Sequence, residues 1–322
     1  MQSASRLDGI HHVTAITGDA RRNLDFYTGV LGLRLVAKSV NQDEAGFYHL
    51  FYGDERGTPG SLITFFEYPG AVPGRAGAGM VHRLVWRVES RDALDFWSAR
   101  LSAHALPRVE REPDRLLFSD PEGLGHELTV SAGPDAPLVA SHPEVTAKLA
   151  LQGLLGVRAY AADPELGRGL LEGILGARPL APAEWELRGD RRGGTIAYDA
   201  APAARGHRSA GTVHHVAWAT SREEQPLWDE RLRAARVPTS GVIDRHFFRA
   251  IYFREPSGVL FEVADDAPGF AAGGDVEQLG SGLALPPWLE PRRHEISAVL
   301  TPLPDPRSQL TTTIDAKEGS ND

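Results

Sequence analysis

The stretch that decides the fold is residues 9–36, GIHHVTAITGDARRNLDFYTGVLGLRLV, because residues 154–180, LLGVRAYAADPELGRGLLEGILGARPL, follow the same plan. Each stretch begins with a short apolar strand, continues through an acidic turn residue, and then shows a helical pattern. A glycine ends that pattern thirteen positions after the acidic residue in both copies, and a left-handed glycine is a common helix stop. The matching pairs are Asp19 with Asp163 and Gly32 with Gly176. The identical spacing predicts two copies of one strand and helix unit.

Two more stretches also form a pair. Residues 79–86, GMVHRLVW, match residues 211–218, GTVHHVAW, and the closing strand PEGLGHELTV at 121–130 matches PSGVLFEVAD at 256–265. Self-similarity of this kind is the signature of a duplicated architecture. With turn residues between the later strands, each unit reads as βαβββ. The sequence therefore predicts an α+β protein made of four βαβββ modules.

The length sets the domain organisation. The 322 residues are about twice the usual domain size of roughly 150 residues. We therefore predict two domains of paired βαβββ modules, at residues 1–140 and 145–270, with a boundary in the polar, proline-containing stretch 133–143. Residues 271–322 are predicted to be a C-terminal extension that contains a short helix and ends in a frayed tail.

Composition excludes several classes of function. The chain has no cysteine, so thiolate metal sites, disulfides and cysteine nucleophiles are ruled out, and any metal must be held by His, Asp or Glu. Its net charge of −9, without a basic stripe, disfavours nucleic acid as a partner. No apolar run is long enough for a membrane span, and the first residues lack a secretory signal. These features predict a cytoplasmic protein without membrane partners.

Three side chains are candidates for a metal site. In a regular strand His11 and His12 point to opposite faces, so one of them at most can be a direct ligand. The repeat register favours His12, which aligns with His215 at the second histidine of each HHV. Glu262 lies in an apolar strand, where a buried carboxylate is costly unless a metal compensates its charge. Two imidazoles and one carboxylate form the facial triad typical of non-haem Fe(II), and the same ligands suit Mn(II).

The corresponding positions of the other two modules lack these ligands. Arg83 stands where the second module should supply a histidine, and Gly156 replaces His12 in the third, although Glu127 is retained. Thr64 stands in the first module at the position of Glu262. We therefore predict one mononuclear site between the first and fourth modules, with Glu127 as a structural residue or salt-bridge partner.

This combination resembles the vicinal oxygen chelate superfamily of glyoxalases and extradiol dioxygenases. Within it, YHLFYGDERGTPGSLITFF, RHFFRAIYFREPSGVLFEVA and LPPWLEPRRHEI are similar to the hydroquinone-type ring-cleaving dioxygenases. The resemblance covers residues 8 to about 300. It implies the vicinal oxygen chelate fold, metal ligands at His12, His215 and Glu262, and Fe(II)-dependent cleavage of a hydroquinone or catechol-type ring with both atoms of O2 inserted.

The resemblance also implies residues that act on the substrate. Tyr252 and Arg245 match the family's tyrosine and arginine near the metal, and His246 is a candidate histidine near the dioxygen site. His11 corresponds to a position that the family uses as acid or base. Regular strand alternation points His11 away from the metal, so it reaches the site only if the strand has a bulge or twist near its start.

Two other classes of function remain open. A glyoxalase-like isomerase or transferase would use the same metal without consuming O2, and a small-molecule-binding protein on this fold would hold no metal. The dioxygenase is our preferred hypothesis, and its partners are a small aromatic substrate and O2. The C-terminal extension could pack on another subunit, which makes a homo-oligomer a further candidate partner.

Overall fold

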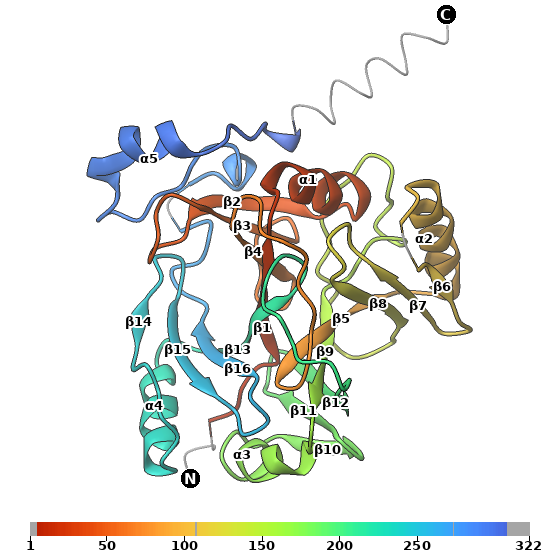
Figure 1. Cartoon of the computed structure of the whole chain (residues 1–322), viewed down its shortest axis with the longest axis vertical. Helices are drawn as coiled ribbons and strands as arrows, with labels where there is room; N and C mark the ends of the chain where they lie inside the picture. The colour runs from red at the N-terminus through yellow and green to blue at the C-terminus, as the bar shows by residue number, and fades with distance from the viewer. Residues whose placement is uncertain (1–4, 107, 273, 308–322) are drawn as a thin grey trace, which may run out of the picture.

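The computed structural model describes residues 5–106, 108–272 and 274–307. The two modules of the first half follow the predicted order of strand, helix and strands (Figure 1). The first module consists of β1 (Ile10–Thr17), α1 (Ala20–Leu24), a π-helical segment (Asp25–Val30), β2 (Arg34–Val40), β3 (Tyr48–Gly53) and β4 (Leu62–Glu67). The second consists of β5 (Met80–Val88), α2 (Arg91–Ala103), β6 (Glu110–Arg111), β7 (Arg115–Ser119) and β8 (Gly125–Val130).

The modules of the second half repeat this plan. The third consists of β9 (Leu154–Ala161), a 3₁₀ turn (Pro164–Gly167), α3 (Arg168–Gly173), β10 (Arg178–Ala181), β11 (Glu184–Arg188) and β12 (Gly193–Ala200). The fourth consists of β13 (Val213–Thr220), α4 (Gln225–Ala234), β14 (Ile243–Asp244), β15 (Arg249–Arg254) and β16 (Leu260–Asp265). The predicted α+β class with four βαβββ modules is confirmed.

The strands of the described residues form two eight-stranded sheets, and each sheet joins one module of the first half of the chain to one module of the second half. One sheet has the order β14-β15-β16-β13-β1-β4-β3-β2 and joins modules four and one. The other has the order β10-β11-β12-β9-β5-β8-β7-β6 and joins modules three and two. The predicted division between 1–140 and 145–270 therefore does not separate the sheets, because β1 pairs with β13 and β5 pairs with β9 across it.

Both predicted helix boundaries of the repeat are present. Asp19 caps α1 by accepting a hydrogen bond from the backbone N–H of Arg22, as expected for an acidic N-cap. Gly32 has φ 68° and Gly176 has φ 72°, the left-handed conformation that ends a helix. The first helix differs from expectation in its second half, where residues 25–30 are π-helical.

The C-terminal extension packs against the first module. Its predicted short helix is α5 (Arg293–Val299), which follows a 3₁₀ turn (Glu290–Arg292). The extension is bound to β2 and β3, because Leu283 bridges to Lys38 and the carbonyl of Thr301 accepts from the hydroxyl of Tyr48. Another 3₁₀ turn of the extension, Val276–Gln278, lies before this helix in the chain. The predicted frayed tail, TIDAKEGSND at residues 313–322, lies outside the described residues.

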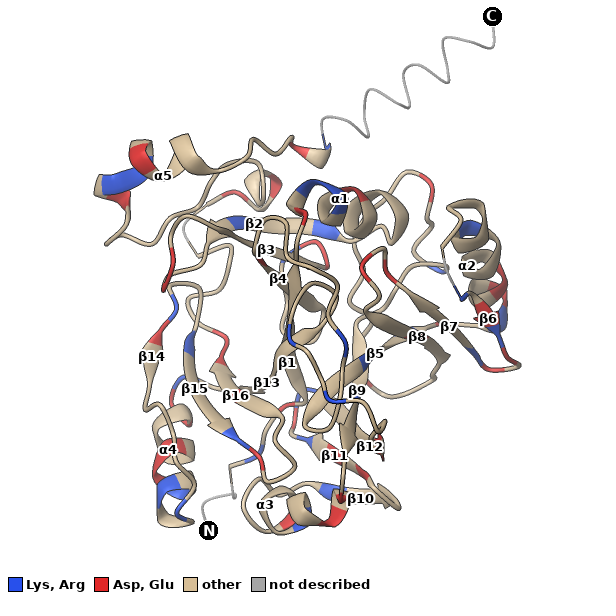
Figure 2. Cartoon of the chain, viewed as in Figure 1, with Lys and Arg blue, Asp and Glu red and all other residues tan. Residues whose placement is uncertain are grey.

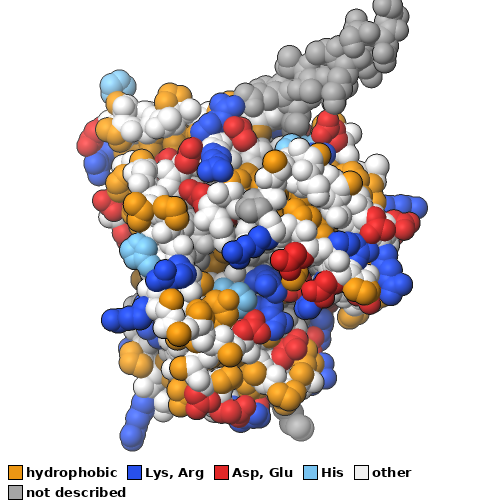
Figure 3. Space-filling model, turned by 45° about the vertical axis from the view of Figure 1, so that its right-hand side comes forward, with side chains coloured by type: hydrophobic (Ala, Val, Ile, Leu, Met, Phe, Trp, Pro, Cys, Tyr) orange, Lys and Arg blue, Asp and Glu red, His pale blue; other side chains and the backbone are white. Residues whose placement is uncertain are grey.

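Charged side chains lie mainly on helices, loops and strand ends, with both signs intermixed (Figure 2). One face carries a group of Lys and Arg side chains near its middle, with acidic side chains beside it (Figure 3). Among the described residues, no helix is long and apolar enough to cross a membrane.

Candidate metal centre

Three adjacent strands of one sheet place the predicted ligands side by side. β16, β13 and β1 are neighbours in the sheet (Figure 1), and Ala217 of β13 pairs with His12 on one side and with Glu262 on the other. His215 lies two residues before Ala217 and so projects from the same face of the sheet. The pairing register therefore brings His12, His215 and Glu262 together although they are far apart in sequence.

The three side chains converge to metal-ligand distances. The Nε2 atoms of His12 and His215 lie 3.1 Å apart, and the Oε2 atom of Glu262 lies 3.4 Å from the first and 2.8 Å from the second. Adjacent ligands around a metal with bonds of about 2.1 Å are about 3 Å apart. These are the only three described residues of ligating type that cluster in this way.

Glu262 has the environment expected of a metal ligand. It is fully buried, and among the described residues neither carboxylate oxygen has a hydrogen-bond partner of acceptable geometry. Burial alone raises the pKa of Glu262, but the positive charge that His12 and His215 can carry outweighs this effect and holds the pKa well below its usual range. A buried carboxylate without a hydrogen-bond donor is costly, so a bound cation would stabilise this arrangement. The residues therefore fit a divalent metal.

Each histidine ligand candidate is supported by the histidine that precedes it. The Nδ1 atoms of His11 and His12 lie 2.9 Å apart, and those of His214 and His215 lie 2.8 Å apart. Burial lowers the pKa of His11 to about 3 and that of His214 to about 3, so both rings are neutral and each can accept a hydrogen bond at Nδ1 from the next histidine. Such contacts fix the tautomer that directs Nε2 toward a metal.

The bulge on which the position of His11 depends is present. The ladder between β1 and β13 shifts register between Ile10 and His12. As a result the side chain of His11 does not point to the face of the sheet opposite to His12. Its ring lies against His12 and Phe248, at centroid distances of 5.1 and 5.0 Å. His11 is buried and lies behind the ligand candidates, since it does not line the adjacent cavity.

A cavity lies in front of His12 and His215. Its volume is only about 30 Å³, enough for a water molecule or a substrate oxygen. An outer groove of about 470 Å³ shares several wall residues with it, including Tyr252 and Arg245. Aromatic side chains form much of the inner wall, namely Phe51, Phe66, Phe247 and Phe248.

Tyr252 and Arg245 lie at this cavity as predicted. Tyr252 pairs directly with Glu262 across β15 and β16, and its ring centroid is 5.6 Å from that of His215. Burial, followed by the negative charge of Glu262, raises the pKa of Tyr252, so its hydroxyl keeps its proton at neutral pH. The guanidinium carbon of Arg245 lies 5.4 Å from the centre of the Tyr252 ring, and its Nη1 is 3.3 Å from Asp43.

His246 is displaced from the other predicted site residues. It has a positive φ of 71° in a turn, and its backbone N–H donates to Asp244. Its ring packs on Phe247 at 4.7 Å and lies 6.3 Å from the ring of Trp288. It lines neither the inner cavity nor the outer groove, because the turn directs Arg245 inward and the next side chain toward the extension.

His49 is a further residue that lines the cavity, beyond the predicted site residues. Its Nε2 lies 2.9 Å from Oγ1 of Thr64, and its ring packs between Phe51 and Phe66. The loop residues Asn41, Gln42 and Asp43 were also missed. The alternation of His49 with Phe51 on one face of β3 was the available signal, since β3 belongs to the same sheet as β1.

The corresponding position in the other sheet has an ion pair. Nη1 of Arg83 lies 3.3 Å from Oε2 of Glu127, which confirms the predicted role of Glu127 as a salt-bridge partner. A Cβ atom at Gly156 would lie 2.0 Å from Oγ1 of Thr195, so there is no room for a histidine there. The predicted single centre between modules one and four therefore agrees with the geometry of the described residues.

Comparison with known proteins places the chain in a family. Residues 9–128 match the model of the glyoxalase/bleomycin resistance protein/dioxygenase superfamily. The chain is 38% identical to the Bacillus subtilis (strain 168) protein named "Putative ring-cleaving dioxygenase MhqE", over 92% of this chain and 100% of that protein. It is 30% identical to the chlorohydroquinone/hydroquinone 1,2-dioxygenase of Sphingobium indicum, over 92% of this chain and 97% of that protein.

Solved structures give the same result. A crystal structure of a Bacillus subtilis protein described as a "putative dioxygenase" superposes with a TM-score of 0.86 at 38% identity, covering 94% of this chain and 99% of that chain. Glyoxalase I from Zea mays superposes with a TM-score of 0.57 at 16% identity, covering 80% and 92%, and shares the fold. The chain therefore belongs to the glyoxalase/bleomycin resistance protein/dioxygenase superfamily.

Proposed function

We propose that the protein is an Fe(II)-dependent dioxygenase that cleaves the ring of a hydroquinone or catechol-type aromatic. The observation that carries the proposal is the convergence of His12, His215 and Glu262 at the bottom of an aromatic-walled cavity. Two histidines and one carboxylate leave coordination positions open for other molecules, and Fe(II) is the metal most often held by such a set. The names of the relatives support the same reaction class.

A ferrous ion at this triad would supply Lewis acidity toward a substrate oxygen and redox chemistry toward O2. Mn(II) is an alternative that the same ligands accommodate. In the overall reaction one carbon–carbon bond of the ring breaks and both oxygen atoms of O2 enter the product. The reaction needs no external reductant, because the ring itself is oxidised.

The chain's own residues orient the substrate and its protons. Tyr252 keeps its phenolic proton and can donate a hydrogen bond to a substrate oxygen beside His215. Arg245 is a fixed cation that attracts a phenolate, and its contact with Asp43 holds it at the mouth of the cavity. We propose that these two side chains bind the substrate oxygens.

Aromatic side chains line both the inner cavity and the outer groove, which favours an aromatic substrate. Because the inner cavity holds only about 30 Å³, we propose that the ring lies in the outer groove with one oxygen directed inward. Phe247 and Phe248 are buried beside the ligand candidates and would exclude water from the reacting atoms. A dry site prevents side reactions of activated oxygen.

The test is anaerobic reconstitution with Fe(II), metal analysis, and an oxygen-electrode trace as hydroquinones and catechols are added. We expect one metal ion per chain and stoichiometric O2 uptake with loss of the aromatic absorbance. The His215→Ala variant should lose metal and O2 uptake together. Bound metal without O2 uptake for any substrate would instead support a glyoxalase-like isomerase or transferase, and failure to bind metal would support a binding protein.

A further inference from the structure

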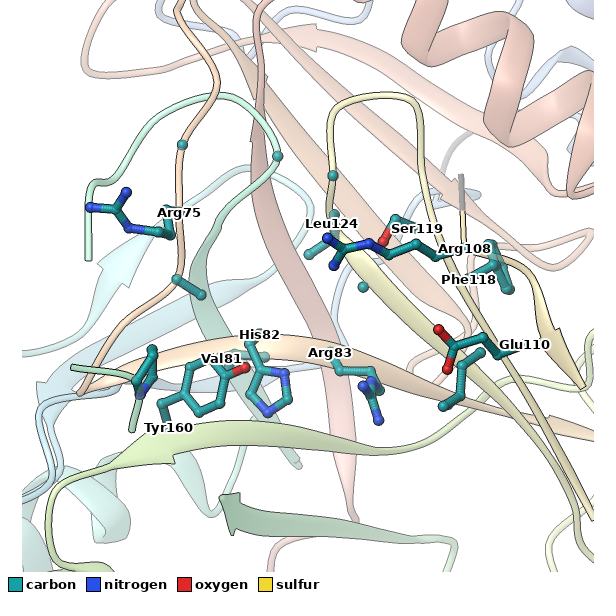
Figure 4. Close-up of a pocket in the computed structure, with 17 residues that line it drawn as sticks. Arg75, Val81, His82, Arg83, Arg108, Glu110, Phe118, Ser119, Leu124 and Tyr160 are labelled. Carbon is teal, nitrogen blue, oxygen red and sulfur yellow. The ribbon is translucent and has the colours of Figure 1, made fainter. Parts of the chain in front are cut away.

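A second cavity, of about 450 Å³, lies on the sheet that has no metal triad (Figure 4). Strands β5, β7 and β9 contribute to its walls together with the loops around residues 74–76 and 123–125. It is much larger than the inner cavity at the triad, and no described wall residue belongs to both. It is therefore a separate feature of the molecule.

The pairing registers show that this cavity corresponds to the metal centre. Arg83 of β5 pairs with Arg158 of β9, just as His215 pairs with Thr14 in the other sheet. Val85 pairs with both Gly156 and Glu127, as Ala217 does with His12 and Glu262. Arg83 and Glu127 thus stand at the positions of two of the three candidate ligands.

At this position Arg83 supplies a fixed cation. The guanidinium of Arg83 makes one ion pair, at 3.3 Å to Glu127, among the described residues. It carries five N–H donors in a planar fork, so one contact to a carboxylate leaves donors for a ligand. Where the first cavity presents a ligand set for a metal, the second presents a permanent positive charge.

Two further arginines reinforce that charge. Arg108 reaches from its loop toward the middle of the cavity in Figure 4 and makes no ion pair with a described residue. The guanidinium of Arg75 donates to the backbone carbonyl of Arg205, at 2.9 and 3.3 Å, and makes no ion pair with a described residue. Glu110 is the one acidic side chain that lines the cavity within the described residues. A chain of net charge −9 therefore has a locally basic cavity, which favours an anion.

The cavity also offers a flat aromatic surface. The rings of His82 and Tyr160 stack at 3.8 Å with an interplanar angle of 11°, and Figure 4 shows them side by side at one end of the cavity. His82 is held in place by Asp199, 2.8 Å from its Nε2. Stacked rings of this kind can pack against a planar ligand.

We propose that this cavity is a binding site for a small aromatic or conjugated carboxylate. The carboxylate would pair with Arg83 and Arg108, and the planar part of the ligand would lie against Tyr160 and His82. The site requires neither the metal triad nor the proposed ring cleavage, so it can be tested independently of both.

The experiment is a calorimetric titration of the full chain with 4-hydroxybenzoate, compared with the neutral 4-hydroxybenzyl alcohol. We expect saturable binding of the acid and at least tenfold weaker binding of the alcohol. Arg108→Ala should weaken binding of the acid about tenfold, because it removes one of the two proposed cationic partners. Arg108 is exposed and makes no ion pair with a described residue, so its loss should not disturb the fold. Glu110→Gln should strengthen binding of the acid severalfold, because the one acidic side chain among the described residues that line the cavity becomes neutral.

Two variants assign the binding to one cavity. The double variant Arg83→Gln with Glu127→Gln keeps a neutral hydrogen-bonding pair while removing the cation, and it should weaken binding as much as Arg108→Ala. Arg245→Ala, at the metal cavity, should leave binding unchanged. Loss of binding in Arg245→Ala with normal binding in the other variants would place the acid in the first cavity and overturn the proposal. Equal affinity for acid and alcohol, or no binding at millimolar concentration, would overturn it as well.

Discussion

The Nδ1 atoms of His11 and His12 lie 2.9 Å apart, although neighbours in a regular strand point in opposite directions. The register shift between Ile10 and His12 makes this contact possible. The neutral ring of His11 can then accept a hydrogen bond from the Nδ1–H group of His12 and hold the Nε2 atom of His12 toward His215 and Glu262. His11 is thus a residue that positions a metal ligand from behind.

We expect His11→Ala to weaken Fe(II) binding by about 10- to 100-fold, because an outer partner orients the ligand ring. His11→Gln, which keeps a hydrogen-bond acceptor, should recover part of the affinity. Metal affinity measured by competition with a chelator distinguishes these outcomes. His246→Ala is the matched control and should bind Fe(II) normally; equal loss in both variants would argue against a specific role for His11.

The sequence predicted the triad because repetition supplied a register that one strand alone could not. The prediction aligned His12 with His215 because each is the second histidine of an HHV stretch. In the structure Ala217 pairs with both His12 and Glu262, and His215 projects from the same face of the sheet. Sheet partners were harder to predict. Nothing in the order of the modules indicates that β1 pairs with β13 in preference to a strand of the second module, because pairing depends on long-range contacts.

Loop residues at the cavity were predicted less well than strand residues. Arg245 and His246 are adjacent, yet one lines the cavity and the other does not, because a positive φ at His246 turns the chain. Gln42, which donates to the carbonyl of Arg245, lies in a loop without periodicity. Backbone turns of this kind leave little trace in a hydrophobic pattern, so side-chain direction there depends on tertiary contacts.

Glu262 and Glu127 offer a direct comparison between the two sheets. Glu262→Gln removes a charged ligand, so Fe(II) affinity should fall by at least about 100-fold and O2 uptake should be lost. Glu127→Gln makes the same chemical change at the corresponding position, where Arg83 is the partner, and should retain one iron per chain. Iron content after gel filtration, measured for both variants, checks the expectation. Iron loss in Glu127→Gln would show that the second sheet also supports the centre.

Tyr252→Phe should retain iron but lower kcat/KM for a hydroquinone by about 10²- to 10³-fold, as loss of one well-placed donor to a reacting oxygen does. The ring remains, so packing beside His215 is preserved. Initial rates of O2 uptake at several substrate concentrations give the value. Tyr68→Phe, in the outer groove, is the control and should change the rate by less than about threefold. Full activity of Tyr252→Phe would exclude its hydroxyl from the reaction.

Asp120 should make stability depend on pH. It is buried and accepts a hydrogen bond from Tyr27 at 3.0 Å, and burial raises its pKa from 3.8 to about 6. The folded state therefore binds this proton more tightly than the unfolded state, so the contribution to stability is present below pH 3.8 and is lost as pH rises through 6. The change amounts to about 2 to 3 kcal/mol.

Asp120→Asn removes this titration while keeping an oxygen that can accept from the backbone N–H groups of Glu122 and Leu124. The free energy of unfolding of the variant, minus that of the native chain, should therefore become more positive between pH 4 and pH 7, so the variant gains stability relative to the native chain. Urea unfolding at a series of pH values measures this difference. A difference that does not vary with pH would show that Asp120 titrates normally in the folded chain.

Close contacts at Gly156 prevent a simple substitution from placing a histidine at the position that corresponds to His12. A Cβ atom there would meet Oγ1 of Thr195 at 2.0 Å and its backbone oxygen at 2.9 Å, so neighbouring strands β9 and β12 would have to separate. We expect Gly156→Ala to destabilise the fold by about 1 to 3 kcal/mol. Gly173→Ala, where no atom lies within 4 Å of the added carbon, should be neutral or slightly stabilising in thermal unfolding. If the two variants unfolded alike, close strand packing would not be the reason that a histidine is excluded from this position.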